Sequence, residues 1–407
     1  MTTTIEAPAH VPPALFWDHD PNVFAQEMDD PFLAISRLHD GPDIIWAAQA
    51  GRAKRGAWLA TRHALVQEIF LDPVRFSSLD SSGVQTQLGV DWKLLPLEVD
   101  PPEHGDYRLI LQPWFQPAAI KAMEAGMRRG AEEIIASFED RDGCEFISEF
   151  AQLFPSYVIL ELMNLPRDML PTFLKWESAF IHAKSIDERA VAVRKIASYM
   201  ADFLEERRRG PRRDDVIQAI LEAQIRGRPL TQAEIMGLTM ILYTGGLDTV
   251  LSSLGWYFRY LATDQALQAR LRENPQDIPQ VVDELLRAYG VVGRPRTVTQ
   301  DMVFHGVEMK KGDVVMAPGW LAGRDPHQYP DPHRIDPDRK PRHLTLATGP
   351  HNCVGSHLAK REIKIVLEAF LSRFENIRLA PGETASWQTT GVWSVTRLPL
   401  VWDRIQA

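Results

Sequence analysis

The chain has 407 residues, of which 45% are hydrophobic, and it carries a formal net charge of −9 at pH 7. This length is enough for a large buried core, and the negative charge argues against a nucleic-acid binder, which needs a basic footprint to displace phosphate counterions. The two cysteines, Cys144 and Cys353, lie far apart in unlike contexts, so we predict no disulfide framework, and a reducing cytoplasm fits best. No apolar run approaches the roughly 20 residues that span a bilayer, and the N-terminus lacks the features of a signal peptide, so we expect no membrane association.

The first hundred residues predict a small sheet-rich lobe followed by a binding loop. Residues 1–30 contain four prolines and should be mostly irregular. Within the lobe, roughly residues 35–76, short β-like runs at 44–46 and 57–60 precede a helix-like segment at 64–70. Residues 77–99 lack helical periodicity and are rich in Ser, Gly and Gln. A long irregular segment inside a compact chain is typical of a lid or binding loop.

Helices dominate the prediction from residue 101 to residue 288. We see no fixed-period repeat and no low-complexity linker, so we predict one mainly helical domain over residues 1–407 with a minor β region. The last third should contain short strands at 296–308 and 313–317, a Pro/Asp-rich meander at 325–342, a helix at 354–374 and a strand pair around 375–402. The expected helices of the body lie at 102–111, 117–138, 142–164, 167–183, 186–207, 213–226 and 231–262.

The run 231–262 predicts one long buried helix. Thr231 and Glu234 form a capping box, with the threonine side chain accepting from the N3 amide and the glutamate reaching back. At 1.5 Å per residue the helix is on the order of 45 Å long. Its middle is apolar on nearly every side, which requires burial.

A glycine pair interrupts this helix at Gly245 and Gly246. Two glycines cost roughly 2 kcal/mol of helix propensity relative to alanine, so a gain in packing or in function should offset that cost. Thr249 shares a face with Gly245, and a threonine hydroxyl there can divert a backbone carbonyl. Two interpretations stay open at this point: a packing notch where another element crosses closely, or an oxygen site.

Cys353 follows a turn at Gly349-Pro350 and precedes the expected helix at 354–374. The N-terminus of a helix favours the thiolate, which sulfur needs in order to bind iron. Gly355 leaves room for a flat ligand, and Gly349 allows a positive φ. On spacing alone, however, a lone cysteine is more often a small buried hydrophobe than a ligand.

The run Gly349-x-His351-x-Cys353-x-Gly355 resembles the haem-ligand loop of the cytochrome P-450 monooxygenases. The resemblance implies a triangular single-domain prism with a long central helix over the haem. It also implies haem b (iron protoporphyrin IX), with Cys353 as the thiolate ligand that pushes electron density toward O–O cleavage. The family usually has Phe-Gly where this chain has Leu346-Ala347, so aromatic packing near the sulfur is lost.

The segment 244–250 resembles the distal-helix motif of the same family. By this resemblance Thr249 hydrogen-bonds at the oxygen site and Asp248 gates protons from the surface. Gly245 and Gly246 are implied to make the space that dioxygen and its water occupy.

Two further sets of charged residues fit the family. Glu284 and Arg287, three apart on one helix face, would alone be a solvated pair worth under ~1 kcal/mol. With the segment 332–337 they resemble a helix-to-meander brace that Arg334 would complete, and deleting one member of it should cost roughly 3–5 kcal/mol. The haem propionates need polar and cationic partners. The resemblance assigns this role to His104, Arg108, Arg296 and His351.

Several stretches, among them 94–103, 304–313 and 398–402, resemble the bacterial camphor-hydroxylase branch. That branch has a tyrosine at the position of Trp92, and tryptophan differs from tyrosine in bulk and reach. We therefore expect a small apolar terpenoid other than camphor as the substrate, preferably an ionone-like norisoprenoid. Positions that match the substrate pocket of the branch are Trp92, Leu97, Ile241, Thr244, Val292, Val392 and Trp393.

Electrons should come from another protein, because no G-x-G-x-x-G fingerprint for a flavin or nicotinamide opens a βαβ unit. The branch implies a [2Fe–2S] ferredoxin and a flavoprotein reductase, and we expect a cytoplasmic monomer. Two alternatives remain: a peroxide-driven peroxygenase, against which Asp248 and Thr249 argue, and a haem-containing terpenoid-binding protein without turnover. A basic face for an acidic ferredoxin could comprise Arg108, Arg128, Arg129, Lys340, Lys360 and Arg361.

Overall fold

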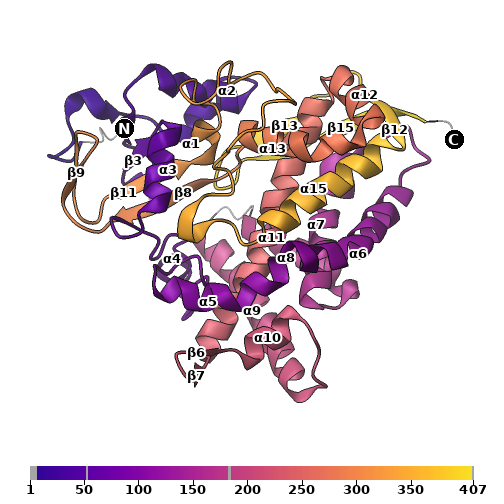
Figure 1. Cartoon of the computed structure of the whole chain (residues 1–407), viewed down its shortest axis with the longest axis horizontal. Coiled ribbons are helices and arrows are strands. Elements are labelled where there is room, and N and C mark those ends of the chain that lie inside the picture. Colours follow the sequence, from indigo (N-terminus) through magenta and orange to yellow (C-terminus); the bar gives the residue numbers. More distant parts are fainter. Residues whose placement is uncertain (1–6, 52–53, 182–184, 406–407) are drawn as a thin grey trace. The chain divides into compact units, whose positions relative to one another are not determined.

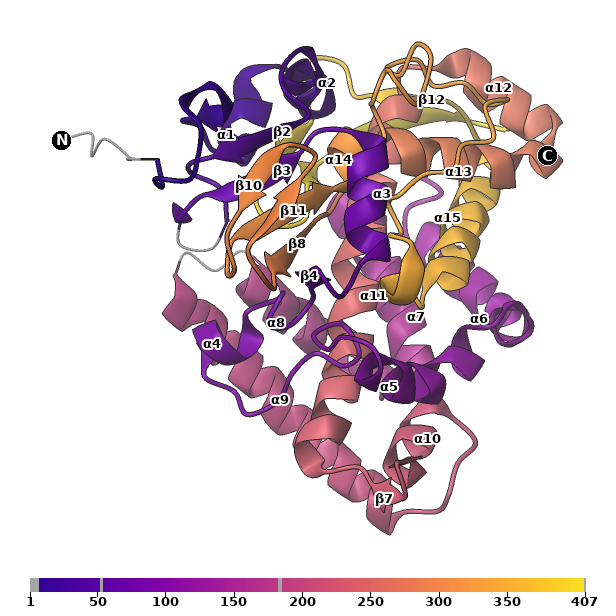
Figure 2. The ribbon, with the colours of Figure 1, turned by 60° about the vertical axis from the view of Figure 1, so that its left-hand side comes forward.

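The computed structural model describes residues 7–51, 54–181 and 185–405. The chain divides into two compact units, each built from segments that are far apart in the sequence. Unit 1 contains Met1–Ser81, Asp277–Cys353 and Trp387–Val395, and unit 2 contains Ser82–Gln276, Val354–Ser386 and Thr396–Ala407. Figures 1 and 2 label their elements. About 52% of the residues are helical, which confirms the mainly α prediction, whereas the single-domain organisation stays a prediction.

Unit 1 is built on a six-stranded sheet with the order β1-β2-β3-β11-β8-β4. Strand β11 pairs parallel with β3 and antiparallel with β8, so it joins the N-terminal segment to residues near 300. The predicted runs at 44–46 and 57–60 are confirmed as β2 and β3. The strands are β1 (Phe16–Trp17), β2 (Ile44–Ala47), β3 (Ala57–Ala60), β4 (Phe76–Ser77), β8 (Gly293–Val298) and β11 (Val314–Pro318).

Strands β2 and β3 are buried along their whole length, which explains why their sequences are apolar without alternation. Trp46 and Trp58 face each other in register, and their rings meet edge to face at 5.1 Å. Gly56 permits this packing, because a Cβ there would lie 2.5 Å from the Trp46 ring. The sheet of unit 1 therefore has a rigid aromatic core beside β11.

Short helices and one hairpin complete unit 1. Helices α1 and α2 each start with proline after an aspartate, Asp20 or Asp30, whose side chain caps the first turn. The helices are α1 (Pro21–Phe24), α2 (Pro31–Ser36), α3 (His63–Leu71), α13 (Ile278–Ala288) and α14 (Gly319–Ala322), the hairpin is β9 (Met302–Phe304) with β10 (Val307–Met309), and 3-10 turns lie at Pro13–Leu15, Ala25–Glu27, Arg37–Asp40 and Gly349–His351.

Unit 2 is mostly helical. Helix α11 packs against α7, α9, α10 and α15, so it forms the centre of this unit (Figure 1). The helices are α4 (Val84–Leu88), α5 (Glu103–Leu111), α6 (Pro117–Ala136), α7 (Leu153–Met163), α8 (Leu170–Ile181), α9 (Ile186–Arg209), α10 (Val216–Glu222), α11 (Gln232–Leu261), α12 (Gln265–Glu273) and α15 (Ser356–Leu371), with turns at Gln112–Phe115, Ile147–Ala151 and Arg167–Met169.

A three-stranded sheet, β12-β15-β5, and the hairpin β6-β7 also belong to unit 2. The strands are β5 (Gly143–Glu145), β6 (Gln224–Ile225), β7 (Arg228–Pro229), β12 (Phe374–Leu379) and β15 (Pro399–Arg404). Strands β13 (Ser386–Gln388) and β14 (Ser394–Arg397) each include residues of both units, and a 3-10 turn at Pro275–Asp277 does the same.

Two predicted helices of unit 2 are wrong in part. The segment 142–164 starts as strand β5 and continues through a π-helical turn into α7. Cys144 pairs with Leu400 on β15, and this long-range pairing overrides the local preference. The segment 213–226 forms only α10, because residues 224–229 turn back as a hairpin at Arg226 and Gly227, both with positive φ. The last two residues of the predicted helix 167–183 lie outside the described residues.

Helix α11 confirms the predicted long central helix and its capping box. The Thr231 side chain accepts from the Glu234 N–H, and the Glu234 carboxylate accepts from the Thr231 N–H. The helix runs unbroken for 30 residues through the glycine pair. Among the described residues it alone is long and apolar enough to cross a membrane, and 61% of its apolar window is buried inside the structure, as in a core helix.

Candidate active site

The cysteine loop belongs to unit 1, and backbone hydrogen bonds hold it. The Cys353 N–H donates to the Leu346 carbonyl at 2.8 Å, and the Asn352 side-chain amide donates to the Ala347 carbonyl at 3.1 Å. Gly349 adopts a φ of +70°, and a Cβ there would lie 2.9 Å from the Phe70 carbonyl on α3. Cys353 itself is exposed. Helix α15 begins at Ser356 rather than at the predicted residue 354, so the cysteine lies in the loop before the helix.

Ala347 carries a backbone conformation that favours glycine. Its φ is +56°, in the left-handed region. The side chain packs against the apolar cluster of unit 1, beside residues of α3 and β8. The loop therefore keeps its turn although alanine stands where the family usually has glycine.

Two arginines of strand β8 lie on one face of the strand, because they are two residues apart. Arg296 is 3% exposed, its guanidinium lies 5.5 Å from the centre of the Phe70 ring, and it donates to the Pro295 carbonyl. Burial lowers the pKa of Arg294, and the charge of Cys353 opposes that shift, so the two groups lie within electrostatic reach. Arg294 was not among the predicted residues, although its spacing from Arg296 could have indicated it. His351 is half-buried in the turn just before Cys353.

In unit 2 the glycine pair of α11 serves two purposes. A Cβ on Gly246 would lie 2.2 Å from Ile159 of α7, so this glycine is a packing notch. A Cβ on Gly245 would meet only Ile241 of its own helix, at 3.9 Å, and Gly245 is exposed in the middle of a largely buried helix. The prediction that both glycines make space for dioxygen is therefore corrected: Gly245 borders open space, and Gly246 holds α7.

Thr249 and Asp248 lie one turn beyond Gly245. The Thr249 hydroxyl donates to the Gly245 carbonyl at 3.1 Å, as the sequence predicted for a diverted carbonyl. Asp248 is largely buried, and burial raises its pKa to about 6, against a hydrogen bond from the Ser252 hydroxyl at 3.4 Å. A carboxyl with such a pKa gains and loses a proton near neutral pH.

Helix α5 of unit 2 carries the other two predicted propionate residues. His104 is 3% exposed, and Arg108, one turn later, is half-buried. Burial and the nearby Arg108 charge lower the pKa of His104 to about 4. At neutral pH His104 is therefore a neutral hydrogen-bonding group, and Arg108 is the cation of this pair.

The residues that match the substrate pocket divide between the units. Trp92, Leu97, Ile241 and Thr244 belong to unit 2, and the Thr244 hydroxyl donates to its own helix at the Met240 carbonyl. In unit 1, Val292 and Val392 are half-buried.

Trp393 is a core residue of unit 1. It is 1% exposed, it stacks on Trp320 at 4.8 Å, and its indole N–H donates to Asn22. Because its ring and its N–H are both occupied by the core, we leave Trp393 out of the proposed substrate pocket.

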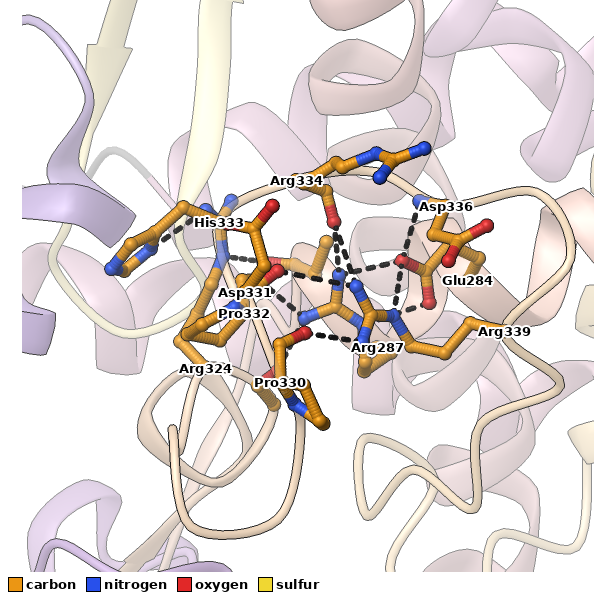
Figure 3. A network of polar contacts seen from close by, with 12 residues as sticks. Glu284, Arg287, Arg324, Pro330, Asp331, Pro332, His333, Arg334, Asp336 and Arg339 are labelled. Atoms are coloured by element: carbon orange, nitrogen blue, oxygen red, sulfur yellow. Dashed lines mark hydrogen bonds and ion pairs between the residues drawn. The ribbon is translucent and has the colours of Figure 1, made fainter.

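The predicted brace exists in unit 1, but its third member differs (Figure 3). Glu284 and Arg287 are fully buried and form a two-pronged pair at 2.7 and 2.8 Å. The third side chain is Arg339, which donates to Glu284 at 3.1 Å. Arg334 supplies only its backbone carbonyl, at 3.1 Å from Arg287, and its exposed side chain points away from the network in Figure 3.

The prediction of Arg334 as the third member is therefore wrong, and the geometry of the meander gives the reason. The Asp336 N–H donates to Glu284 at 2.9 Å, which fixes the turn at 336–338 against the carboxylate. Arg339 follows that turn and reaches back, whereas the side chain of Arg334 precedes it and leaves toward solvent.

Each unit by itself offers residues of the kinds that fit the haem group implied by the resemblance. Unit 1 offers an exposed cysteine sulfur with a buried and a half-buried arginine on the neighbouring strand. Unit 2 offers the open side of Gly245, which a Cβ would fill, and the His104–Arg108 pair. A thiolate ligand, cations for two propionates and an apolar helix face with one glycine gap are the groups that a thiolate-ligated haem requires.

Comparisons with known proteins identify the family of the chain. The sequence model of the family described as "Cytochrome P450" matches residues 154–388. The probable cytochrome P450 127A1 of Sinorhizobium fredii is 32% identical over 402 residues, which cover 97% of this chain and 96% of that protein. Cytochrome P450-terp of a Pseudomonas species is 30% identical and covers 79% of this chain and 82% of its own.

Solved structures show the same relationship. Cytochrome P450 CYP101C1 has a TM-score of 0.88 and 31% identity, and the match covers 98% of this chain and 100% of that one. CYP101J2 has a TM-score of 0.87 at 29% identity, with 98% and 99% covered. The predicted fold, cofactor and enzyme class are confirmed. The chain belongs to the cytochrome P450 family, and it is a haem-dependent monooxygenase.

Proposed function

We propose that the protein hydroxylates a small apolar terpenoid or norisoprenoid with dioxygen and electrons from a [2Fe–2S] ferredoxin. The observation that carries the proposal is the open side of α11 at Gly245, with a hydroxyl and a largely buried carboxyl one turn away. The CYP101 structures support the camphor-hydroxylase-like branch. Another relative, 30% identical over 85% of this chain, is a mycinamicin IV hydroxylase/epoxidase of Micromonospora griseorubida, so relatives at this identity differ in substrate.

Haem, when bound, supplies dioxygen activation and the oxidation of an unactivated C–H bond. Cys353 is the residue that would ligate its iron, and Arg108, His104, Arg296 and His351 would hold the propionates. Arg294 adds a second positive charge beside the cysteine loop. Positive charge near the sulfur favours the thiolate over the thiol.

Protons reach the oxygen site through α11. Asp248, with a pKa of about 6, accepts a proton from solvent and releases it at working pH. The Thr249 hydroxyl donates to the Gly245 carbonyl, so its oxygen can still accept a hydrogen bond. Because the Gly245 carbonyl already accepts from this hydroxyl, its oxygen is oriented before any substrate binds.

The substrate lies against apolar surface. Leu97 and Ile241 are half-buried aliphatic residues, and Trp92 is 4% exposed on the segment that precedes α5. The Thr244 hydroxyl is occupied by the Met240 carbonyl, so it offers an acceptor rather than a donor. Such a pocket suits a hydrocarbon skeleton with at most one or two polar atoms.

The ferredoxin binds at a basic face of unit 2 formed by α6 and α15. Arg128 bridges Glu124 and Glu368 at 2.7 Å each, and Arg361 also pairs with Glu124. These two arginines tie α15 to α6, and Arg129 and Lys360 add positive charge to the same two helices. A cytoplasmic location and a monomeric state belong to the same proposal.

The test is a screen of small terpenoids, including α-ionone, β-ionone and camphor, against the ferric haem protein. A substrate should shift the iron from low to high spin, and the same compound should give a hydroxylated product with ferredoxin, reductase and NADH. Product formation with peroxide alone at an equal rate would favour the peroxygenase instead. Binding without product under both conditions would contradict the proposal.

A further inference from the structure

One buried carboxylate connects the two ends of the segment 82–98 of unit 2 by hydrogen bonds. Glu98 is 1% exposed, and its Oε1 accepts from both the N–H and the hydroxyl of Ser82, at 2.9 and 2.5 Å. Its Oε2 accepts from the Leu94 N–H at 2.8 Å. One side chain therefore joins the start of the segment to its end, across 16 residues.

The same segment is packed directly onto helix α11. A Cβ on Gly237 would lie 2.1 Å from the Lys93 carbonyl and 3.3 Å from the Leu95 side chain, so only glycine allows this close approach. The short helix α4 at the other end of the segment packs against α9. Its two ends are glycines with positive φ, Gly83 and Gly89. The segment thus has fixed contacts at both ends.

The contact with α11 lies on the helix face that carries the open side of Gly245. Gly237, Ile241 and Gly245 are four residues apart in succession, so they share one face. At 1.5 Å per residue the Lys93 contact lies roughly 12 Å along the helix axis from Gly245. Trp92 and Leu97, which match substrate positions, lie on the segment itself.

We propose that Glu98 is a positioning residue, whose carboxylate holds the segment 82–98 as a fixed wall along this face of α11 and thereby limits which ligands enter. The inference rests on the proposed role of the Gly245 face as the ligand side. A carboxylate is suited to this role because it accepts three hydrogen bonds at once from two separate donor residues. Glutamine has one acceptor oxygen and an NH₂ that cannot accept from an N–H, so Glu98→Gln loses either the contacts with Ser82 or the contact with Leu94.

The chain offers a matched control at Glu145. This glutamate also accepts from a serine N–H and hydroxyl, at 2.7 and 2.6 Å on Ser148, and from a leucine N–H, at 2.6 Å on Leu398. It ties β5 to the turn before α7 and to the residue before β15. Glu145→Gln therefore makes the same chemical change in unit 2 without touching the segment 82–98.

Two measurements on the haem-loaded, substrate-free protein test the proposal. Hydrogen exchange should rise about tenfold at the peptide 82–98 in Glu98→Gln, because a charge-assisted hydrogen bond is lost, and it should not rise there in Glu145→Gln. Stopped-flow binding of imidazole and 4-phenylimidazole then reports entry to the iron. In Glu98→Gln the association rate of the larger ligand should rise at least about threefold relative to the smaller one.

An unchanged exchange rate at 82–98, or an unchanged ratio of the two association rates, would overturn the proposal. An equal change of the ratio in Glu145→Gln would also overturn it, because the effect would then be general loosening. If Glu98→Gln does not load haem, Ser82→Ala is used instead, because it removes only the hydroxyl contact. It should give smaller changes in the same direction. If exchange and association rates are both unchanged in Ser82→Ala, the proposal is overturned. Neither probe is a substrate, so these outcomes are independent of whether terpenoids are hydroxylated.

Discussion

At the scale of single residues, the hydroxyl of Thr249 links the structure of α11 to the proposed chemistry. Thr249→Ala should leave substrate binding intact but lower product per electron pair severalfold, with hydrogen peroxide released, because no hydroxyl remains beside Gly245 to orient protons. Thr249→Ser should retain coupling. Ser253→Ala is the control, because its hydroxyl donates to a backbone carbonyl of the same helix at 2.8 Å. The measurement is the amount of product and of peroxide formed for each NADH consumed. Unchanged coupling in Thr249→Ala would remove the residue from the mechanism.

Asp248 should destabilise the protein as the pH rises. Its pKa is raised from 3.8 to about 6, so the folded state holds a proton that the unfolded chain releases. The free energy of unfolding is therefore highest below pH 4, falls as the pH rises toward 6, and stays at its lower value above pH 6. The shift corresponds to about 2–3 kcal/mol.

Asp248→Asn removes this penalty, so its stability advantage over the parent should grow between pH 4 and pH 6 while its turnover falls. Thermal unfolding of both proteins across that pH range is the measurement. A stability difference that does not vary with pH would show that Asp248 is not protonated in the folded protein.

Ala347 stands in a left-handed turn that glycine adopts with less strain. Ala347→Gly should therefore stabilise the cysteine loop by up to about 1 kcal/mol, which is the relief of the left-handed strain less the greater freedom of glycine in the unfolded chain. The rate of haem loss to a haem-scavenging apoprotein measures this locally, and it should fall. Ala347→Val, which adds a β-branch at the same φ, should raise that rate, and the opposite order would contradict the assignment of strain.

At the scale of elements, the brace of unit 1 gives a direct comparison between two arginines five residues apart. Arg339→Ala removes one charge-assisted hydrogen bond to the buried Glu284, which stays paired with Arg287, and should cost roughly 1.5–3 kcal/mol of unfolding free energy. Arg334→Ala keeps the backbone carbonyl that Arg287 uses, so it should cost less than about 0.5 kcal/mol. Chemical denaturation of the two variants separates them, and equal losses would restore Arg334 to the network.

The elements that sequence predicted well are those set by local pattern. Helix α11 follows from its capping box and its apolar residues, and α5, α6 and α9 follow from their periodicity. Strand β5 was missed because its partner, β15, lies more than 250 residues away in the sequence. The two glycines of α11 could not be told apart from sequence, because only the position of Ile159 on α7 separates a notch from an open side.

At the scale of the whole molecule, each unit is assembled from segments that are interleaved along the sequence. Motif resemblance could propose Cys353, Thr249 and Arg296 for the site because each lies within a short run of fixed spacing. The contacts of Arg339 and Glu98 could not be predicted in this way, because each depends on a turn that brings the side chain back to an earlier part of the chain. The core contacts of Trp393 were not predictable for a similar reason, since its partners Asn22 and Trp320 come from other segments.

The net charge of −9 makes electron delivery a question of local rather than total charge. An acidic ferredoxin is repelled by the whole molecule and attracted only at a basic face, so its binding should depend on a few cations. Arg129→Glu with Lys360→Glu should raise the ferredoxin KM about tenfold or more, leave kcat nearly unchanged and weaken the dependence on ionic strength. Arg208→Glu with Arg212→Glu makes the same change in net charge on another part of unit 2, near the end of α9, and should have little effect. If both double variants raise KM equally, total charge controls the encounter and α6 with α15 is not the docking face.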